Sequence, residues 1–235
     1  MRRALRILGT VLAAAGASML IWALVVWQWQ DPFTAVYTKW KQHELRSQYD
    51  ERARSFEGSI SSTSLAAEQA SVARAARRYR VSSKSGQAIG RLRIPHIGLS
   101  MFFVNGTDHE TLKKGPGRDL RTFMPGENRL VYIAGHRTTY LAPFSHIDSL
   151  RAGNRVTIEV PYGTFIYSVT RHRIVVATDL SVLNSPRHEL LALQACHPRF
   201  FASHRYIAYA RLIRVEPRGG IPYEPPLLKA QASGR

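Results

Sequence analysis

The spacing of apolar and polar residues divides the chain into a helical N-terminal part and a β-rich remainder. Arg2, Arg3 and Arg6 precede an uncharged, mostly apolar stretch from about Ile7 to Trp29. This stretch is long enough to span a bilayer, for which about 20 apolar residues suffice. Because positive charge precedes the span, we expect a cytoplasmic N-terminus and an exported remainder.

A cleaved signal peptide is the competing interpretation of this stretch. The segment Ala13-Ala-Ala-Gly-Ala17 offers the small residues of a cleavage site, but the apolar run continues well past it. We therefore expect residues 1–30 to form a cytoplasmic stub and an uncleaved transmembrane anchor. Trp22, Trp27 and Trp29 would then lie toward the extracellular end of the span.

Residues 31–88 have the pattern of a helical juxtamembrane segment and linker. Apolar or aromatic residues at Phe33, Val36, Tyr37 and Trp40 follow a helical spacing, and the sequence then becomes strongly charged. We expect this first helix, up to about residue 56, to be exposed to solvent. Residues 58–64 resemble a Ser/Thr/Gly linker, and a second helix is predicted over 66–79.

From Ile89 onward, short β-type runs alternate with Gly, Pro and Asn. Eight predicted strands over about 125 residues favour a closed or nearly closed barrel. Short helical or turn segments are predicted over 108–112 and 143–150. The fold is therefore expected to be mainly β over residues 89–216, followed by a disordered tail over 217–235. The predicted strands are 91–94, 99–104, 130–134, 155–160, 164–169, 174–177, 190–195 and 206–215.

The formal net charge of +17 narrows the partners without deciding the function. Such a field favours anionic neighbours, among them nucleic acid, acidic lipid headgroups and anionic envelope polymers. The basic residues are scattered, and nucleic acid is the least favoured of the three. We find no dinucleotide-binding fingerprint, phosphate-binding loop or paired-cysteine zinc motif, and we expect no cofactor and no metal site.

A single thiol gives the chain its candidate chemistry. Cys196 closes an apolar run, Arg205 follows nine positions later, and His136 closes another apolar run sixty residues upstream. A thiolate attacks acyl carbon, a histidine can move protons to and from an amine, and an arginine can stabilise an oxyanion. The three residue types together suggest covalent catalysis.

Less specific interpretations remain open from the residues alone. A lone cysteine after an apolar strand is more often buried packing than a nucleophile, and a Gly-His pair is more often part of a turn. Arg205 can equally be a solvated edge-strand residue. His197 and His204 are closer to Cys196 in sequence and are secondary candidates for the base.

Three motifs together resemble the sortases, transpeptidases that attach proteins to Gram-positive cell envelopes. They are Leu92-Arg-Ile-Pro-His-Ile-Gly98, Ala134-Gly-His-Arg-Thr-Thr-Tyr-Leu-Ala-Pro-Phe144, and Cys196-His-Pro-Arg-Phe with Arg205. The Gly-His-Arg-Thr-Thr-Tyr and Cys-His-Pro forms are most similar to class E sortases of actinobacteria. This resemblance implies an eight-stranded sortase-type β-barrel, with His136, Cys196 and Arg205 in the catalytic positions.

The chain departs from the family pattern beside the nucleophile. The usual Thr-Leu-x-Thr-Cys is replaced by Ala192-Leu-Gln-Ala195-Cys196, and Leu141 stands where relatives often have Gly. From the resemblance we expect four residues to contact substrate. These are Ala195, Leu193, Thr138 and Tyr140.

The resemblance also implies a reaction, partners and a location. A secreted protein with a C-terminal Leu-Ala-x-Thr-Gly-like or Leu-Pro-x-Thr-Gly-like signal would be cleaved between Thr and Gly through a Cys196 thioester. It would then pass to a cell-wall amine, with the enzyme at the membrane, its catalytic domain outside, and no nucleic acid involved. The position of residues 178–189, between the predicted strand that ends at Ala177 and the one that leads to Cys196, suggests a wall over the peptide groove, with a plain surface loop as the open alternative.

Two alternatives stay open. One keeps the cysteine chemistry, as a pilin-polymerising sortase or a thiol hydrolase in which water resolves the thioester. The other is a non-enzymatic basic β-barrel that binds anionic envelope polymer or lipid, with Cys196 inert.

Overall fold

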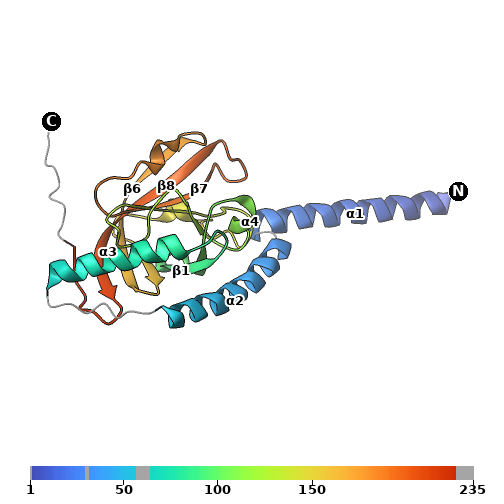
Figure 1. Cartoon of the computed structure of the whole chain (residues 1–235). Coiled ribbons are helices and arrows are strands. Elements are labelled where there is room, and N and C mark those ends of the chain that lie inside the picture. Colours follow the sequence, from blue (N-terminus) through green and yellow to red (C-terminus); the bar gives the residue numbers. More distant parts are fainter. Residues whose placement is uncertain (1, 30–31, 57–63, 226–235) are drawn as a thin grey trace, which may run out of the picture.

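A computed structural model describes residues 2–29, 32–56 and 64–225. Helix α1 (Arg2–Trp29) extends away from the rest of the molecule (Figure 1). Its segment Arg2–Leu24 is long and apolar enough to cross a membrane, and none of it is buried inside the protein. This confirms that the N-terminal helix has the predicted membrane-spanning length and apolar composition.

Eight strands close into a barrel in the order β1-β2-β3-β4-β7-β8-β6-β5, as the predicted fold class requires. Short helices connect them: η1 (Pro95–Ile97), α4 (His109–Leu112), η2 (Ile147–Ser149) and η3 (Leu180–Leu183). The strands are β1 (Ala88–Ile94), β2 (Leu99–Asn105), β3 (Gly117–Arg118), β4 (Leu130–Ala134), β5 (Arg155–Val160), β6 (Gly163–Val176), β7 (Leu190–His197) and β8 (His204–Pro217).

The strand order in the barrel differs from the chain order where β4 is followed by β7. Strand β4 pairs in parallel with β7, and β7 pairs antiparallel with β8. Antiparallel neighbours can be joined by a short loop, whereas a parallel pair needs a long connection. Residues 135–189 make that connection, and they bring segments sixty residues apart to one end of the barrel.

Alternate strand residues fill the barrel, because successive side chains of a strand point to opposite faces. Strand β7 shows the pattern clearly, with Leu191, Leu193 and Ala195 in the main core and Gln194 partly exposed. Large rings complete the packing, among them Tyr162 and Phe165, whose centroids are 5.7 Å apart. The inward-facing side chains of β7 are therefore part of one packed core.

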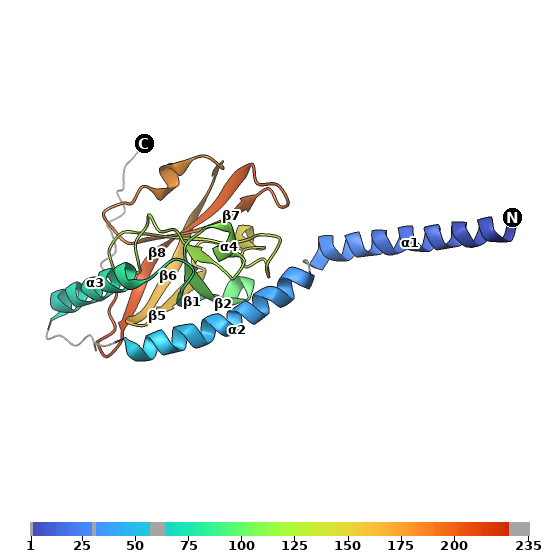
Figure 2. The same cartoon turned by 45° about the vertical axis from the view of Figure 1, so that its right-hand side comes forward.

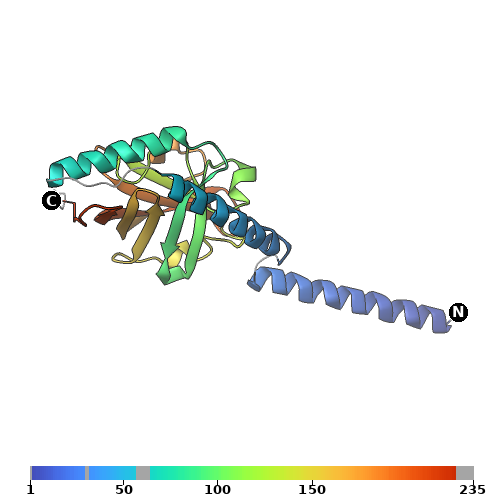
Figure 3. The ribbon, with the colours of Figure 1, turned by 60° about the horizontal axis from the view of Figure 1, so that its bottom comes forward.

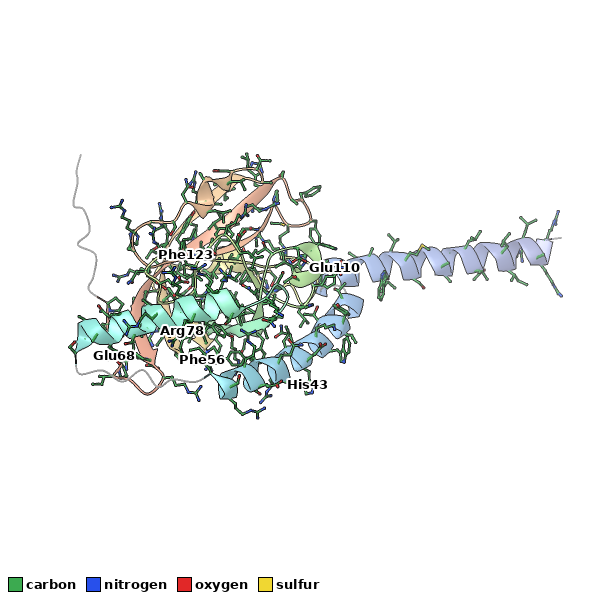
Figure 4. The ribbon with its side chains drawn as sticks, in the orientation of Figure 1. His43, Phe56, Glu68, Arg78, Glu110 and Phe123 are labelled. Carbon is green, nitrogen blue, oxygen red and sulfur yellow. The ribbon has the colours of Figure 1, made fainter. Side chains whose placement is uncertain are left out.

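Helix α3 (Leu65–Ser82) covers part of the barrel with one face. Ser64 caps its N-terminus by accepting a hydrogen bond from the Ala67 N–H at 3.3 Å. Val72, Ala76 and Tyr79 are buried at helical spacing. Phe56, which follows α2, lies between the two helices and packs edge-on against Tyr79 (Figure 4).

Helix α2 (Pro32–Ser55) curves along the barrel wall (Figures 2 and 3). Thr38 and Leu45 on its inner face are buried, and the Tyr49 ring packs at a tilt against Phe102 with ring centroids 5.4 Å apart. His43 lies on the exposed outer face (Figure 4). The expectation of a wholly solvent-exposed helix is therefore wrong, because polar side chains make much of the docking face.

Three further details of the sequence interpretation are corrected. The runs 164–169 and 174–177 belong to one strand, β6, since its pairing with β8 continues from Gly163 to Val176. The two-residue strand β3 was not anticipated. Of the tail expected to be disordered, residues 226–235 lie outside the described residues, but Tyr223 pairs with Val215. The expected linker over 58–64 lies almost wholly outside the described residues.

Candidate active site

Cys196 and Arg205 lie directly opposite each other on neighbouring strands. They are register partners in the β7–β8 ladder, one residue before the final pair, His197 with His204. Both side chains are half-buried. The Arg205 Nη1 donates to the carbonyls of Ala202 at 2.7 Å and His204 at 3.0 Å, which orients the guanidinium.

His136 arrives beside Cys196 through the parallel β4–β7 pairing. Ala134 is opposite Gln194, and the Gly135 N–H donates to the Gln194 carbonyl at 3.0 Å. Continuing this register by two residues brings position 136 alongside position 196. Only glycine fits at 135, because a Cβ there would lie 2.7 Å from the Phe144 ring.

The three candidate residues line one cavity of about 260 Å³. One wall comes from Asp179, Leu180, Val182 and Leu183, so the segment 178–189 does border the cavity as expected. The sequence-predicted convergence of a thiol, an imidazole and a guanidinium is therefore present in the structure. The remaining lining residues are Thr107, Leu112, Asp119, Arg121, Tyr132, Ala134, Gly135, Ala177 and Gln194.

Burial sets the electrostatics of His136. Desolvation, helped by the nearby His109, lowers the pKa of His136. The His109 and His136 rings are edge-to-face with centroids 6.5 Å apart, and the Tyr140 ring lies 5.0 Å from the imidazole. The His136 Nε2 is buried and has no hydrogen-bond partner among the residues that the structure describes. Such an imidazolium releases its proton readily, which suits a general acid.

Arg137 is a site residue that sequence reasoning missed. Its side chain is buried, and its Nη2 donates to Asp148 Oδ2 at 2.6 Å. Its Nη1 lies 3.0 Å from His197 Nδ1 and donates to the Cys196 carbonyl at 3.3 Å. This guanidinium therefore ties the residue after His136 to the backbone of Cys196.

The four residues expected to contact substrate have different surroundings. Leu193 and Ala195 are fully buried in the barrel core, so their side chains offer no surface to a peptide. Gln194, between them, lines the cavity instead. Thr138 and Tyr140 are half-buried in the loop after His136. On β7, we therefore expect a peptide in the cavity to contact Gln194 rather than Leu193 or Ala195.

Within the described residues, no group of three or more His, Cys, Asp or Glu side chains could hold a metal ion.

Comparison with known proteins then identifies the domain. The model of the sortase domain matches residues 92–213, which is more than half of the chain. The chain belongs to the sortase family.

Curated sortases agree with that assignment. Sortase D of Bacillus subtilis is 33% identical over 134 residues, covering 55% of this chain and 66% of the relative. Sortase SrtE1 of Streptomyces coelicolor is 26% identical, covering 58% and 44% respectively. The matches thus span just under two thirds and less than half of these relatives. The expected similarity to class E sortases is present, and a sortase D is similar as well.

Solved structures match the sortase fold. Sortase E from Streptomyces avermitilis is 30% identical with a TM-score of 0.51, covering 57% of this chain and 93% of its own. A Clostridium perfringens sortase D5 transpeptidase, 24% identical, has a TM-score of 0.58 and covers 74% of this chain and 98% of its own. As a sortase, the chain belongs to a family of cysteine transpeptidases.

Proposed function

We propose that this sortase is a membrane-anchored transpeptidase that cleaves a Thr–Gly bond in a C-terminal sorting signal and transfers the new C-terminus to a cell-wall amine. The observation that carries the proposal is the shared cavity of Cys196, His136 and Arg205. Class E relatives suggest a Leu-Ala-x-Thr-Gly signal. We assign catalysis to the barrel of residues 89–216 and membrane attachment to residues 1–30.

The first half-reaction makes a thioester. The Cys196 thiolate attacks the threonine carbonyl carbon, and Arg205 stabilises the resulting oxyanion. When the tetrahedral intermediate collapses, the C–N bond breaks and His136 gives its proton to the departing glycine amine. The lowered pKa makes protonated His136 a stronger acid for that transfer, and it also reduces the fraction of His136 that carries the proton.

The second half-reaction reverses the proton's path. The acceptor amine attacks the thioester carbonyl, His136 removes a proton from it, and the C–S bond breaks to release the Cys196 thiolate. Arg205 again supports the oxyanion. A membrane anchor suits this chemistry, because secreted substrates and lipid-linked wall precursors both reach the enzyme at the membrane.

Product analysis with and without an added amine tests the proposal. The full chain in detergent, given a Leu-Ala-x-Thr-Gly peptide and a glycine-based amine, is expected to yield an amide-ligated product and free Gly-peptide. A thiol hydrolase would give only the shortened acid. A Cys196→Ala variant that still transfers the peptide would refute the assigned mechanism.

A further inference from the structure

The turn after His136 has an unusual backbone. Tyr140, Leu141 and Ala142 all have positive φ values, of 53°, 61° and 39°. Residues with a side chain rarely adopt this conformation, because the Cβ crowds the following carbonyl. Such strain persists only where the surroundings fix the backbone. Something must therefore hold this turn.

Helix α2 supplies that support from the N-terminal part of the chain. The Tyr140 N–H donates to the Thr34 hydroxyl at 3.1 Å. The Tyr37 ring packs edge-on against the Tyr140 ring, with centroids 6.4 Å apart and planes at 72°. Two successive contacts thus lead from α2 through Tyr140 to His136, whose ring lies 5.0 Å from that of Tyr140.

The start of α2 is itself fixed on the barrel. One turn after Thr34, the buried Thr38 hydroxyl donates to the Lys113 carbonyl at 3.1 Å. A further turn on, the Gln42 amide bonds both backbone groups of Phe102 and the Lys114 carbonyl, at 2.7–2.8 Å. The helix cannot slide without breaking these bonds, so Thr34 is delivered to Tyr140 at a set position.

We infer that the first two turns of α2 position the catalytic histidine, with Thr34 and Tyr37 holding Tyr140 against the His136 ring. The inference rests on the proposed function and deepens it. Because α2 begins three residues after α1 ends, the same contacts place the active site next to the end of the predicted membrane span. Any movement that lifts the start of α2 from the barrel would release the turn beside His136.

The pH behaviour of His136 reports on this contact. The groups that face it are His109 from α4, Tyr140 from its own loop, and Cys196 and Arg205 across the cavity. If Tyr140 moves away, water reaches the imidazole and part of its desolvation is lost. The pKa of His136 should then rise toward its ordinary value.

The test uses the full chain in lipid nanodiscs and three variants. Thr34→Val removes the hydroxyl at nearly constant volume, whereas Thr34→Ser keeps it. Val36→Thr is a matched change on the exposed side of the same helix, where Val36 is 69% exposed. We expect Thr34→Val to lower kcat for peptide transfer about tenfold with KM within about twofold, as for a slightly misplaced catalytic group. Thr34→Ser and Val36→Thr should resemble the wild type.

A second readout does not depend on activity. An NMR titration, with the His136 resonance assigned by its loss in His136→Gln, should show a higher pKa in Thr34→Val and in Tyr37→Leu. Tyr37→Leu also serves if Thr34→Val does not fold. Unchanged kcat and unchanged titration in a folded variant would overturn the inference. Failure of the proposed function can be told apart from failure of this inference. If the proposed function is wrong, the wild type transfers no peptide, while the His136 titration still reports on the contact between α2 and Tyr140.

Discussion

At the scale of single residues, the buried guanidinium of Arg137 links the loop after His136 to the backbone of Cys196. It contacts the Cys196 carbonyl, His197 and Asp148 at once. A lysine at this position has a single charged nitrogen and cannot match that planar fork. We therefore expect Arg137→Lys to lower kcat about tenfold with little change in KM. Asp148→Asn, which keeps the geometry but removes one charge, should fall between that variant and the wild type in the same peptide-transfer assay.

Glu189, just before β7, makes stability depend on pH. It is buried, accepts hydrogen bonds from the Gly126 and Asn128 N–H groups and from the Tyr167 hydroxyl, and desolvation raises its pKa to about 7. Because this exceeds the ordinary value of 4.5, the native protein binds the proton more tightly than the unfolded chain. The contribution to stability is complete below about pH 4.5 and is lost as pH rises through 7, on the order of 3 kcal/mol at most.

Denaturant unfolding at several pH values measures this effect. The difference in unfolding free energy between wild type and Glu189→Gln should shift against the wild type as pH rises from 5 to 8. A difference that stays constant over that range would contradict the assignment.

The sequence predicted the reactive residues better than their neighbours. Cys196, His136 and Arg205 stand in recognisable motifs, and the structure brings them to one cavity. Leu193 and Ala195 were misplaced although the strand period of two already separates them from Cys196: neighbours in a strand face opposite sides. Arg137 stood inside the Gly-His-Arg-Thr-Thr-Tyr motif, but nothing in the sequence showed that its side chain is buried and contacts Asp148, His197 and the Cys196 carbonyl.

At the scale of elements, α2 shows why helix docking could not be read from hydrophobicity. The first three turns of its docking face carry Thr34, Thr38 and Gln42, which are polar, and Leu45 and Tyr49, which pack against apolar barrel residues, come later in the helix. Strand β6 was divided in the sequence interpretation because polar residues at 170–173 interrupt its alternation, yet its ladder with β8 continues through them. Strand β3 is too short for any pattern.

Gln42 provides the sharpest test of α2 docking. Its side chain bonds three backbone groups, the N–H and carbonyl of Phe102 and the carbonyl of Lys114. Gln42→Leu removes these three hydrogen bonds, so we expect a loss of about 2–4 kcal/mol in unfolding free energy. His43→Leu, on the exposed face, is the matched control. Equal stability of the two variants would show that α2 contributes nothing through this contact.

The η3 segment forms a wall of the cavity and should affect binding more than chemistry. Leu180 lines the cavity while 61% of its surface is exposed. Leu180→Ser is expected to raise KM for the peptide several-fold, roughly 1 kcal/mol of lost apolar contact, with kcat nearly unchanged. Arg187→Ser, in the same connection but outside the cavity lining, serves as control. A fall in kcat alone would argue against a role in substrate binding.

At the scale of the whole molecule, the barrel topology joins residues that sequence spacing leaves far apart. The parallel β4–β7 pair brings His136 to Cys196 across a long connection, and no local pattern specifies that pairing. A closed or nearly closed barrel was predictable from the strand-like runs, although two of the predicted runs form the single strand β6 and β3 was missed. The eight-stranded sortase-type barrel and the meeting of the two motifs came from family resemblance. No pattern in the sequence specified where α2 docks on the barrel.

Orientation in the membrane can be tested with the chain's single cysteine. Positive charge before α1 predicts an exported barrel. A small charged methanethiosulfonate reagent that does not cross membranes should therefore label Cys196 in intact cells to the same extent as in lysed cells. Labelling only after lysis would place the domain in the cytoplasm.

The central claim is that Cys196 carries the acyl group. The most direct measurement is intact-protein mass spectrometry of the full chain mixed with a Leu-Ala-x-Thr-Gly peptide and no added amine. The account predicts a mass increase equal to the acyl group that ends at threonine, which is the shortened peptide acid less one water. This mass should be located on Cys196, released by an amine and absent in Cys196→Ala. A wild-type protein whose thiol reacts with small alkylating reagents but never gains this mass, while the peptide is still cleaved, would contradict it.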